Sequence, residues 1–293
     1  ILNAQDSLEK KVRRAIQANL TMGEAFISYY EKNFTNEADL IAIRKLDVAI
    51  YKEGVNGVVK GFSSPYKELI NKYQDNAAAY TLFAIRKFQE VAIASGSEQM
   101  KIFNEAWNAQ IKALEIDPEN ARALYLKAFM DKIYTGVMKK DLLEKAIDIA
   151  PESFDVLWGV ANAYRYNKEP AISIGLYQKA LEIAPYGPSD LKLNLLRAYI
   201  DTEKFDEAES LARDMIASDK NSSYWGNLFL IYLKYEDNKK ETALKIYSDF
   251  IKKNNLNIEK LVSDIANYPW SWDLWYRSNL TNTLKEVDKF RSS

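Results

Sequence analysis

The hydrophobic positions of this chain follow a helical period through most of its length. In one segment, Leu157, Ala161 and Tyr164 recur at intervals of four and three residues, and a few residues later Ser173 and Tyr177 begin the same spacing again. The strict alternation that marks a half-buried β-strand is absent, and glycine (10) and proline (7) are both sparse. These patterns predict a chain that is helical throughout.

A short motif recurs along the chain. It reads KALEIDP at residues 112–118, KAIDIAP at 145–151 and KALEIAP at 179–185. More degenerate versions place Met215 and Phe250 in the slot of the motif's alanine, so the slots are 33 to 35 residues apart. A period near 34 with two helices per unit indicates a stacked helical solenoid, because one such unit cannot bury its apolar face alone.

The repeated units resemble the tetratricopeptide repeat, a helix–turn–helix unit of 34 residues with small residues where its helices cross. That repeat carries an aromatic residue at the end of its first helix, and Tyr164, Tyr199 and Tyr232 recur in this way. Two residues depart from the pattern: Asp131 stands at the aromatic slot of the second unit, and Lys220 stands where proline is expected. We therefore expect some irregularity in the superhelix.

The repeat register divides the chain into three parts. We predict an all-α, tetratricopeptide-like α-solenoid with a helical N-terminal module (1–75), a repeat array of about five units (76–256) and an aromatic-rich capping helix and tail (257–293). The first unit is expected to be irregular, because the connection that carries Ser95-Gly96-Ser97 is longer than usual.

The resemblance implies where a partner would bind, since tetratricopeptide arrays usually hold extended peptides or helices on the concave surface made by their first helices. The groove positions carried over to this sequence are Arg122, Tyr125, Phe129, Trp158, Asn162, Arg165, Asn194, Arg197 and Asn227. Asparagine can donate to and accept from a peptide backbone at once, and Trp, Tyr and Arg dominate binding hot spots. The other interpretation is that Phe129 and Trp158 are buried by a neighbouring helix or by the terminal segment.

One known ligand class of such arrays is not expected here. Chaperone-docking relatives bind a carboxylate with a lysine where Trp158 stands, and with Lys and Arg where Ser223 and Asn227 stand. An acidic C-terminal peptide is therefore not the predicted ligand.

A second cluster of aromatic residues lies near the C-terminus, at Trp270, Trp272, Trp275 and Tyr276. A solenoid must cover the apolar edge of its last repeat, so we expect this segment to act as a cap. The alternatives are a dimer contact, an aromatic platform for a sugar, or an anchor at a membrane interface.

Composition limits the chemistry. The chain has no cysteine and no histidine, which excludes thiolate nucleophiles, zinc sites of the Cys/His type and catalytic triads that use histidine. Its acidic pairs stand among lysines on faces expected to be solvated, so we expect no catalytic site, no cofactor and no metal, although a site made of carboxylates alone stays open. The net charge of -1 gives no electrostatic signature of nucleic-acid binding.

Two features of the sequence bear on the location of the protein. No run of about 20 apolar residues predicts a transmembrane helix. The absence of cysteine and the start at Ile1, which fits either a removed export signal or a cloning junction, favour a periplasmic, cell-envelope or secreted protein, with a cytoplasmic one as the alternative.

The sequence thus predicts a non-enzymatic scaffold that binds a peptide or protein partner in its groove. Two alternatives stay open: an envelope solute- or glycan-binding accessory protein that uses the groove and the C-terminal aromatic residues, and a structural subunit of an oligomer.

Overall fold

The computed structural model describes residues 63–91, 94–185, 189–218, 220–267 and 274–292, together with residues 34, 36, 38, 40, 41 and 43. All regular elements within these residues are helices, which confirms the predicted all-α class. In chain order they are α3 (Ser64–Lys72), α4 (Ala77–Val91), α5 (Gly96–Ile116), α6 (Ala121–Thr135), α7 (Lys140–Ile149), α8 (Phe154–Tyr166), α9 (Pro170–Ile183), α10 (Ser189–Asp201), α11 (Phe205–Ile216), α12 (Lys220–Glu236), α13 (Lys240–Asn254), α14 (Ile258–Asn267) and α15 (Leu274–Ser292).

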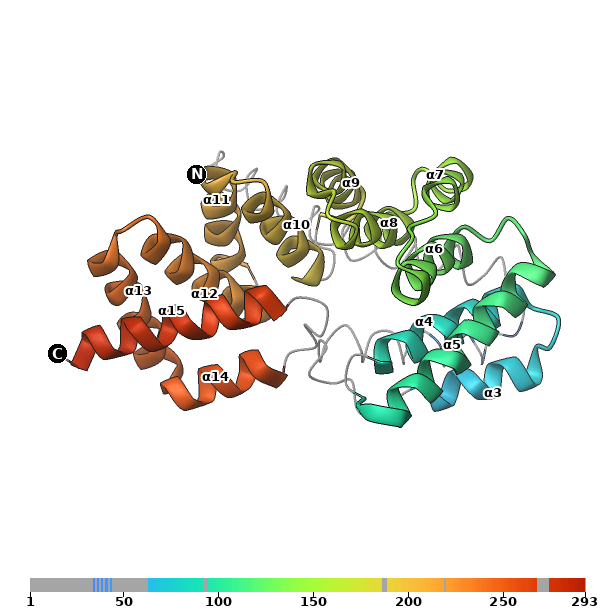
Figure 1. The fold of residues 1–293 in the computed structure, drawn as a ribbon, viewed down its shortest axis with the longest axis horizontal. Helices are drawn as coiled ribbons and strands as arrows, with labels where there is room; N and C mark the ends of the chain where they lie inside the picture. Colours follow the sequence, from blue (N-terminus) through green and yellow to red (C-terminus); the bar gives the residue numbers. More distant parts are fainter. Residues whose placement is uncertain are drawn as a thin grey trace, which may run out of the picture.

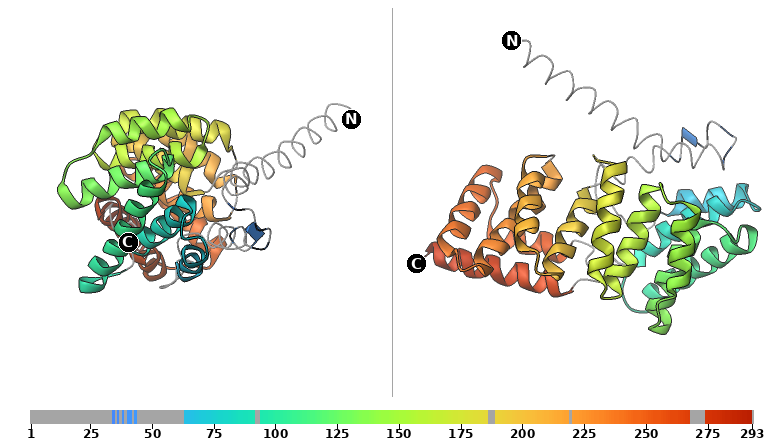
Figure 2. Two further views of the ribbon diagram at one scale, coloured as in Figure 1. Left: turned by 90° about the vertical axis from the view of Figure 1, so that its right-hand side faces the viewer. Right: turned by 90° about the horizontal axis from the view of Figure 1, so that it is seen from above.

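The helices form a curved array of antiparallel pairs (Figure 1). Within the array α4 packs against α5, α6 against α7, α8 against α9, α10 against α11 and α12 against α13, and Figure 2 shows the pairs stacked side by side in its right-hand view. The five register residues of the repeat, Ala113, Ala146, Ala180, Met215 and Phe250, are all buried. The solenoid and its register are therefore as predicted.

The turns between paired helices repeat as well. Lys168, Glu203 and Asn238 all have positive φ angles, of 66°, 58° and 57°, and they stand 35 residues apart. The amide of each following residue closes the turn, as where Lys204 N donates to Tyr199 O over 2.9 Å. A left-handed conformation costs a non-glycine residue about 1–2 kcal/mol, so packing of the two helices must hold each turn.

The N-terminal part of the array has its own hydrophobic core. Phe34 and Ile43 are buried in one cluster with Tyr66 and Leu69 of α3, and this cluster continues into α4 and α5. Apart from residues 34, 36, 38, 40, 41, 43 and 63–75, the predicted N-terminal module lies outside the described residues.

The C-terminal helix α15 packs against α12, α13 and α14. Leu280, Leu284 and Val287 are buried on the face that it turns to them. Figure 1 shows α15 running along the array from α13 toward α10, so it covers the last described repeat and also reaches back over an earlier one.

Candidate functional site

A cavity of about 220 Å³ lies among α4, α6 and α8, the first helices of three successive units. Five of the nine predicted groove residues line it: Arg122, Tyr125, Phe129, Trp158 and Asn162. The structure thus brings five of the six predicted residues of the second and third units together around one hollow, and Arg165 lies beyond it. Four of the eight other lining residues are apolar side chains of α4 and α6: Leu82, Ile85, Phe88 and Leu126.

The aromatic walls of the cavity are packed against their neighbours. The ring of Phe129 makes edge contacts with the rings of Phe88 and Tyr166, at centroid distances of 5.4 and 5.0 Å. The ring of Tyr125 lies on the backbone of α8 at Gly159, where an added Cβ atom would stand 2.5 Å from Tyr125 Cε2. Glycine at this position therefore lets α6 and α8 approach closely and fixes one wall of the cavity.

The charged side chains of the cavity have partners within the chain. The buried guanidinium of Arg122 is paired with the carboxylate of Asp155. Arg86 donates from Nη1 to Gln89 Oε1 over 2.9 Å, and its guanidinium lies 5.5 Å from the centre of the Tyr66 ring. These contacts hold the charged groups in place at the edge of the apolar lining.

Two N–H donors at the cavity lack an acceptor among the described residues. Trp158 Nε1 is buried and has no hydrogen-bond partner there. Asn162 Oδ1 accepts from Tyr177 Oη over 2.8 Å and from Asn194 Nδ2 over 2.9 Å, which leaves the Nδ2 group of Asn162 as a donor with no acceptor in that part of the chain. Burial raises the pKa of Tyr177, so its hydroxyl stays protonated and donates.

The remaining predicted groove residues lie beyond the cavity, and their polar groups interact within the chain. Arg165 Nε lies 2.8 Å from Asp201 Oδ2, and Arg197 Nη1 donates to Asn194 Oδ1 over 2.9 Å. Asn227 Nδ2 donates to Ser223 O in its own helix over 2.7 Å. This half of the predicted groove is therefore connected by internal hydrogen bonds and ion pairs.

Tyr276 of α15 lies against that same half. The guanidinium groups of Arg165 and Arg197 are 5.5 and 5.4 Å from the centre of its ring, and its side chain is buried. Burial, with the negative charge of Asp201 as a further cause, raises the pKa of its hydroxyl. Tyr276 is thus an internal contact and not part of an exposed aromatic surface.

The other aromatic residues of the C-terminal cluster differ from Tyr276. Trp275 is 53% exposed and contacts the ring of Tyr232 edge-on. Trp270 and Trp272 lie outside the described residues. Only Trp275 of the predicted second surface is therefore placed on the outside.

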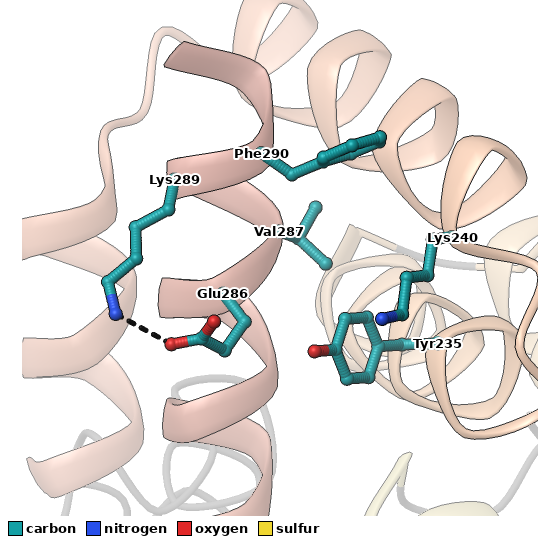
Figure 3. Close-up of a pocket in the computed structure, with 6 residues that line it drawn as sticks. All are labelled: Tyr235, Lys240, Glu286, Val287, Lys289 and Phe290. Carbon is teal, nitrogen blue, oxygen red and sulfur yellow. Dashed lines mark hydrogen bonds and ion pairs between the residues drawn. The ribbon is translucent and has the colours of Figure 1, made fainter. Parts of the chain in front are cut away.

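A second hollow, of about 280 Å³, lies where α15 meets the end of α12 and the start of α13 (Figure 3). Its lining includes Tyr235, Val287 and the half-exposed Phe290. The charged groups around it have partners, since Lys289 is paired with Glu286 at 2.7 Å and Lys240 lies 5.4 Å from the centre of the Tyr235 ring. It has the character of a surface hollow left by the packing of the terminal helix.

The described residues contain no group of three or more His, Cys, Asp or Glu side chains placed to hold a metal ion. None of the helices described is long and apolar enough to cross a membrane.

Comparison with known proteins gives information on the fold. No protein-family model matches the chain, and no curated protein matches it significantly. Similar solved structures include Pseudomonas aeruginosa PilF (17% identity, 74% of this chain and 96% of that one, TM-score 0.49) and PilW, a type IV pilus biogenesis factor (18% identity, 70% and 97%, TM-score 0.46). A third is YrrB, a TPR protein with an unusual peptide-binding site (18% identity, 64% and 91%, TM-score 0.44).

The fold is a tetratricopeptide-like helical solenoid. The internal repeat, its buried register and the stacked antiparallel helix pairs carry that statement for this chain. The three solved structures superpose only loosely on it, so nothing about the ligand or activity of this protein is taken from them.

Sequence reasoning missed the contribution of α4 to the cavity. Arg86 and Gln89 line it together with Asp155 and Gly159, and none of these four was expected there. The irregular first unit left its groove positions unassigned. Gly159 did carry a signal, because a glycine within an otherwise apolar helix often marks a close approach of two backbones.

Proposed function

We propose that the cavity among α4, α6 and α8 binds an extended segment of a partner protein, and that the chain acts as a non-enzymatic interaction scaffold. This proposal rests on two N–H donors, Trp158 Nε1 and Asn162 Nδ2. Both lack acceptors among the described residues, and both belong to residues that line the cavity beside its aromatic rings. Trp158 Nε1 is a buried donor, and a buried donor without a partner costs about 1–3 kcal/mol, so a ligand that supplies it with an acceptor gains this energy on binding.

An extended peptide has the chemistry that this arrangement requires. It presents side chains and backbone carbonyls in alternation, so an apolar side chain can enter the lining of Tyr125 and Phe129 while neighbouring carbonyls accept from Trp158 and Asn162. Ligand sites of this kind combine a mostly apolar lining with a few well-placed polar groups.

Helix α15 limits the length of the proposed site, because it covers part of the predicted groove. Because Tyr276 lies against Arg165 and Arg197, the chain itself covers part of the predicted groove beyond the cavity. We therefore propose a site that spans the first three units, shorter than the groove expected from the repeat register. Binding of a glycan or small solute, assembly as an oligomer subunit and an envelope location stay predictions.

The test begins with a displayed library of random peptides, selected on the wild-type protein. Recovered peptides are then synthesised with a fluorescent label, and their affinities are measured by fluorescence anisotropy. Trp158→Phe removes the Nε1 donor and keeps an aromatic ring, so we expect it to weaken binding by about tenfold, the equivalent of one lost hydrogen bond.

The matched control is Asn227→Ala. This residue belongs to the predicted groove, but its amide donates within α12, outside the cavity, so the affinity of the same peptides should be unchanged. Circular dichroism must show that all variants are equally helical. If recovered peptides bind Trp158→Phe as tightly as wild type, or if no peptide is recovered, the cavity is not the binding site.

A further inference from the structure

Three aromatic rings form a connected group where α5 packs against α6. Phe103 and Tyr134 lie nearly parallel, with ring centres 6.4 Å apart and an interplanar angle of 15°. The ring centre of Trp107 is 5.5 Å from that of Tyr134. Phe103 is buried, but Tyr134 is 66% exposed, so the group continues the hydrophobic core of the first unit out to solvent.

Two apolar side chains that are close to these rings in the sequence are exposed as well. Met100, one helical turn before Phe103 in α5, is 53% exposed, and Val137, three residues after Tyr134, is 62% exposed. Scattered single apolar residues are normal on a protein surface, whereas a group of adjoining ones marks an interaction site.

A cluster of lysines borders the aromatic group. The ammonium of Lys127 lies 5.2 Å from the centre of the Trp107 ring and 2.9 Å from Asp131 Oδ2. Lys139 also reaches Asp131, at 3.3 Å, and Lys132 donates to Gly136 O over 2.8 Å. Lys127 and Lys139 thus contact one buried carboxylate, and Lys132 lies at the end of α6, so these four groups carry an excess of two positive charges.

The origin of the cluster is a departure from the repeat. Asp131 occupies the slot that Tyr164 and Tyr199 fill in later units, and it is buried as they are. Its carboxylate pairs with both Lys127 and Lys139, and of these Lys127 lies over the ring of Trp107. The aspartate that makes the second unit irregular therefore also places charged side chains next to the aromatic group.

We propose that this patch, made of Met100, Trp107, Tyr134 and Val137 with the lysines 127, 132 and 139, docks an acidic segment of a partner protein that carries an aromatic or aliphatic anchor. The anchor packs on Tyr134 and Trp107, which are residue types that dominate binding hot spots. The acidic groups of the segment face the lysine border, and this charge complementarity sets the specificity and speed of association.

The patch is separate from the site proposed above, since none of its residues lines the cavity among α4, α6 and α8. Its test therefore uses a variant on each surface. Peptides are selected on the wild-type protein from a displayed library with one fixed central tryptophan, leucine or phenylalanine and random flanks. Each recovered peptide is then measured against Tyr134→Ser and Trp158→Phe.

We expect to recover a class of peptides that is rich in Asp and Glu. Their affinity should fall roughly tenfold or more with Tyr134→Ser and should be unchanged with Trp158→Phe. The double variant Lys132→Gln/Lys139→Gln keeps Lys127 on Asp131 and should weaken the same class. Raising the salt concentration should weaken it too, because exposed charges are screened.

Phe205→Ser is the matched control, because Phe205 is another exposed aromatic residue, 50% exposed, at the start of α11. It should leave the affinity of these peptides unchanged. The proposal is overturned if no peptide is sensitive to Tyr134→Ser, or if the sensitive peptides lack acidic residues. It is also overturned if sedimentation shows self-association that Tyr134→Ser abolishes, since the patch would then bind a second copy of the chain.

Discussion

The hydroxyl oxygen of Tyr276 lies 2.7 Å from Oδ1 of Asp201, a residue 75 positions earlier in the chain. The same hydroxyl is 2.9 Å from the carbonyl oxygen of Arg197, and the ring lies beside the guanidiniums of Arg165 and Arg197. This contact joins α15 to α10. It places part of the terminal helix on residues that the repeat register assigns to the groove.

Tyr276→Phe removes this hydroxyl and keeps the ring. Asp201 retains its ion pair with Arg165, so we expect the free energy of unfolding to fall by about 1–2 kcal/mol, as for one buried hydrogen bond. Urea denaturation measures the change. Tyr134→Phe is the control, because Tyr134 is mostly exposed, and its loss of a hydroxyl should be nearly neutral. Equal stabilities for the two variants would contradict the role given to Tyr276.

Gly159→Ala tests the close contact of α6 and α8. The new methyl group would stand 2.5 Å from Tyr125 Cε2, so the ring must move, and we expect a loss of about 1–3 kcal/mol in thermal or chemical unfolding. The displaced ring lines the cavity, so peptide affinity should change as well.

Gly175→Ala is the counterpart of that change. Gly175 lies within α9, and an added Cβ atom would meet nothing within 4 Å. Alanine is a better helix former than glycine, so this variant should be about 0.5–1 kcal/mol more stable than wild type. If both Gly→Ala variants were more stable than wild type, then helix propensity, and not the contact with Tyr125, would decide the stability of Gly159→Ala.

The stability of the array should depend on pH through Glu209. A hydrogen bond from Lys234, with a second from Arg213, lowers the pKa of this carboxyl in the folded chain. A lowered folded pKa stabilises the protein above the ordinary carboxyl pKa of about 4.3, and the gain is lost as pH falls through the lowered value. Unfolding free energies of wild type and Glu209→Gln should therefore differ at neutral pH and converge in acid.

Glu241→Gln supplies the comparison for that experiment. Glu241 is an exposed glutamate near the start of α13, and we expect its replacement to leave the unfolding free energy at neutral pH close to the wild-type value. The role given to Glu209 would be wrong if its own variant were as stable as this one at neutral pH.

Asn120 fixes the start of α6. Its side-chain oxygen accepts from the backbone amide of Ala123 over 3.1 Å, as an N-cap does. Asn120→Ala should cost about 1 kcal/mol of unfolding free energy, whereas Asn120→Asp keeps an acceptor and should restore most of it. Failure of the aspartate to do so would show that another contact of Asn120 matters more.

Much of the fold could be predicted because the signal is local and repeated. Ala113, Ala146 and Ala180 recur at the crossing of two helices, and the buried state of each follows from the same pattern of neighbours. The groove positions of the second and third units followed from that register, and Tyr125 and Trp158 do line one cavity.

Local patterns could not predict which of those positions stay accessible. The amphipathic pattern of α15 says that one face is buried, but not that Tyr276 reaches α10. The unsatisfied donor of Trp158 is equally hidden from the sequence, because it depends on which side chains of other helices fail to reach it.

The sequence by itself determined the helices, their pairing and the repeat register, since these depend on periodic apolar positions and on contacts between neighbouring units. Only the tertiary structure decided where the groove is open, how α4 contributes to it and which aromatic rings are exposed at Tyr134 and Trp275. The physical reason is that these features arise from contacts between helices far apart in the chain, and such contacts leave no periodic trace in it.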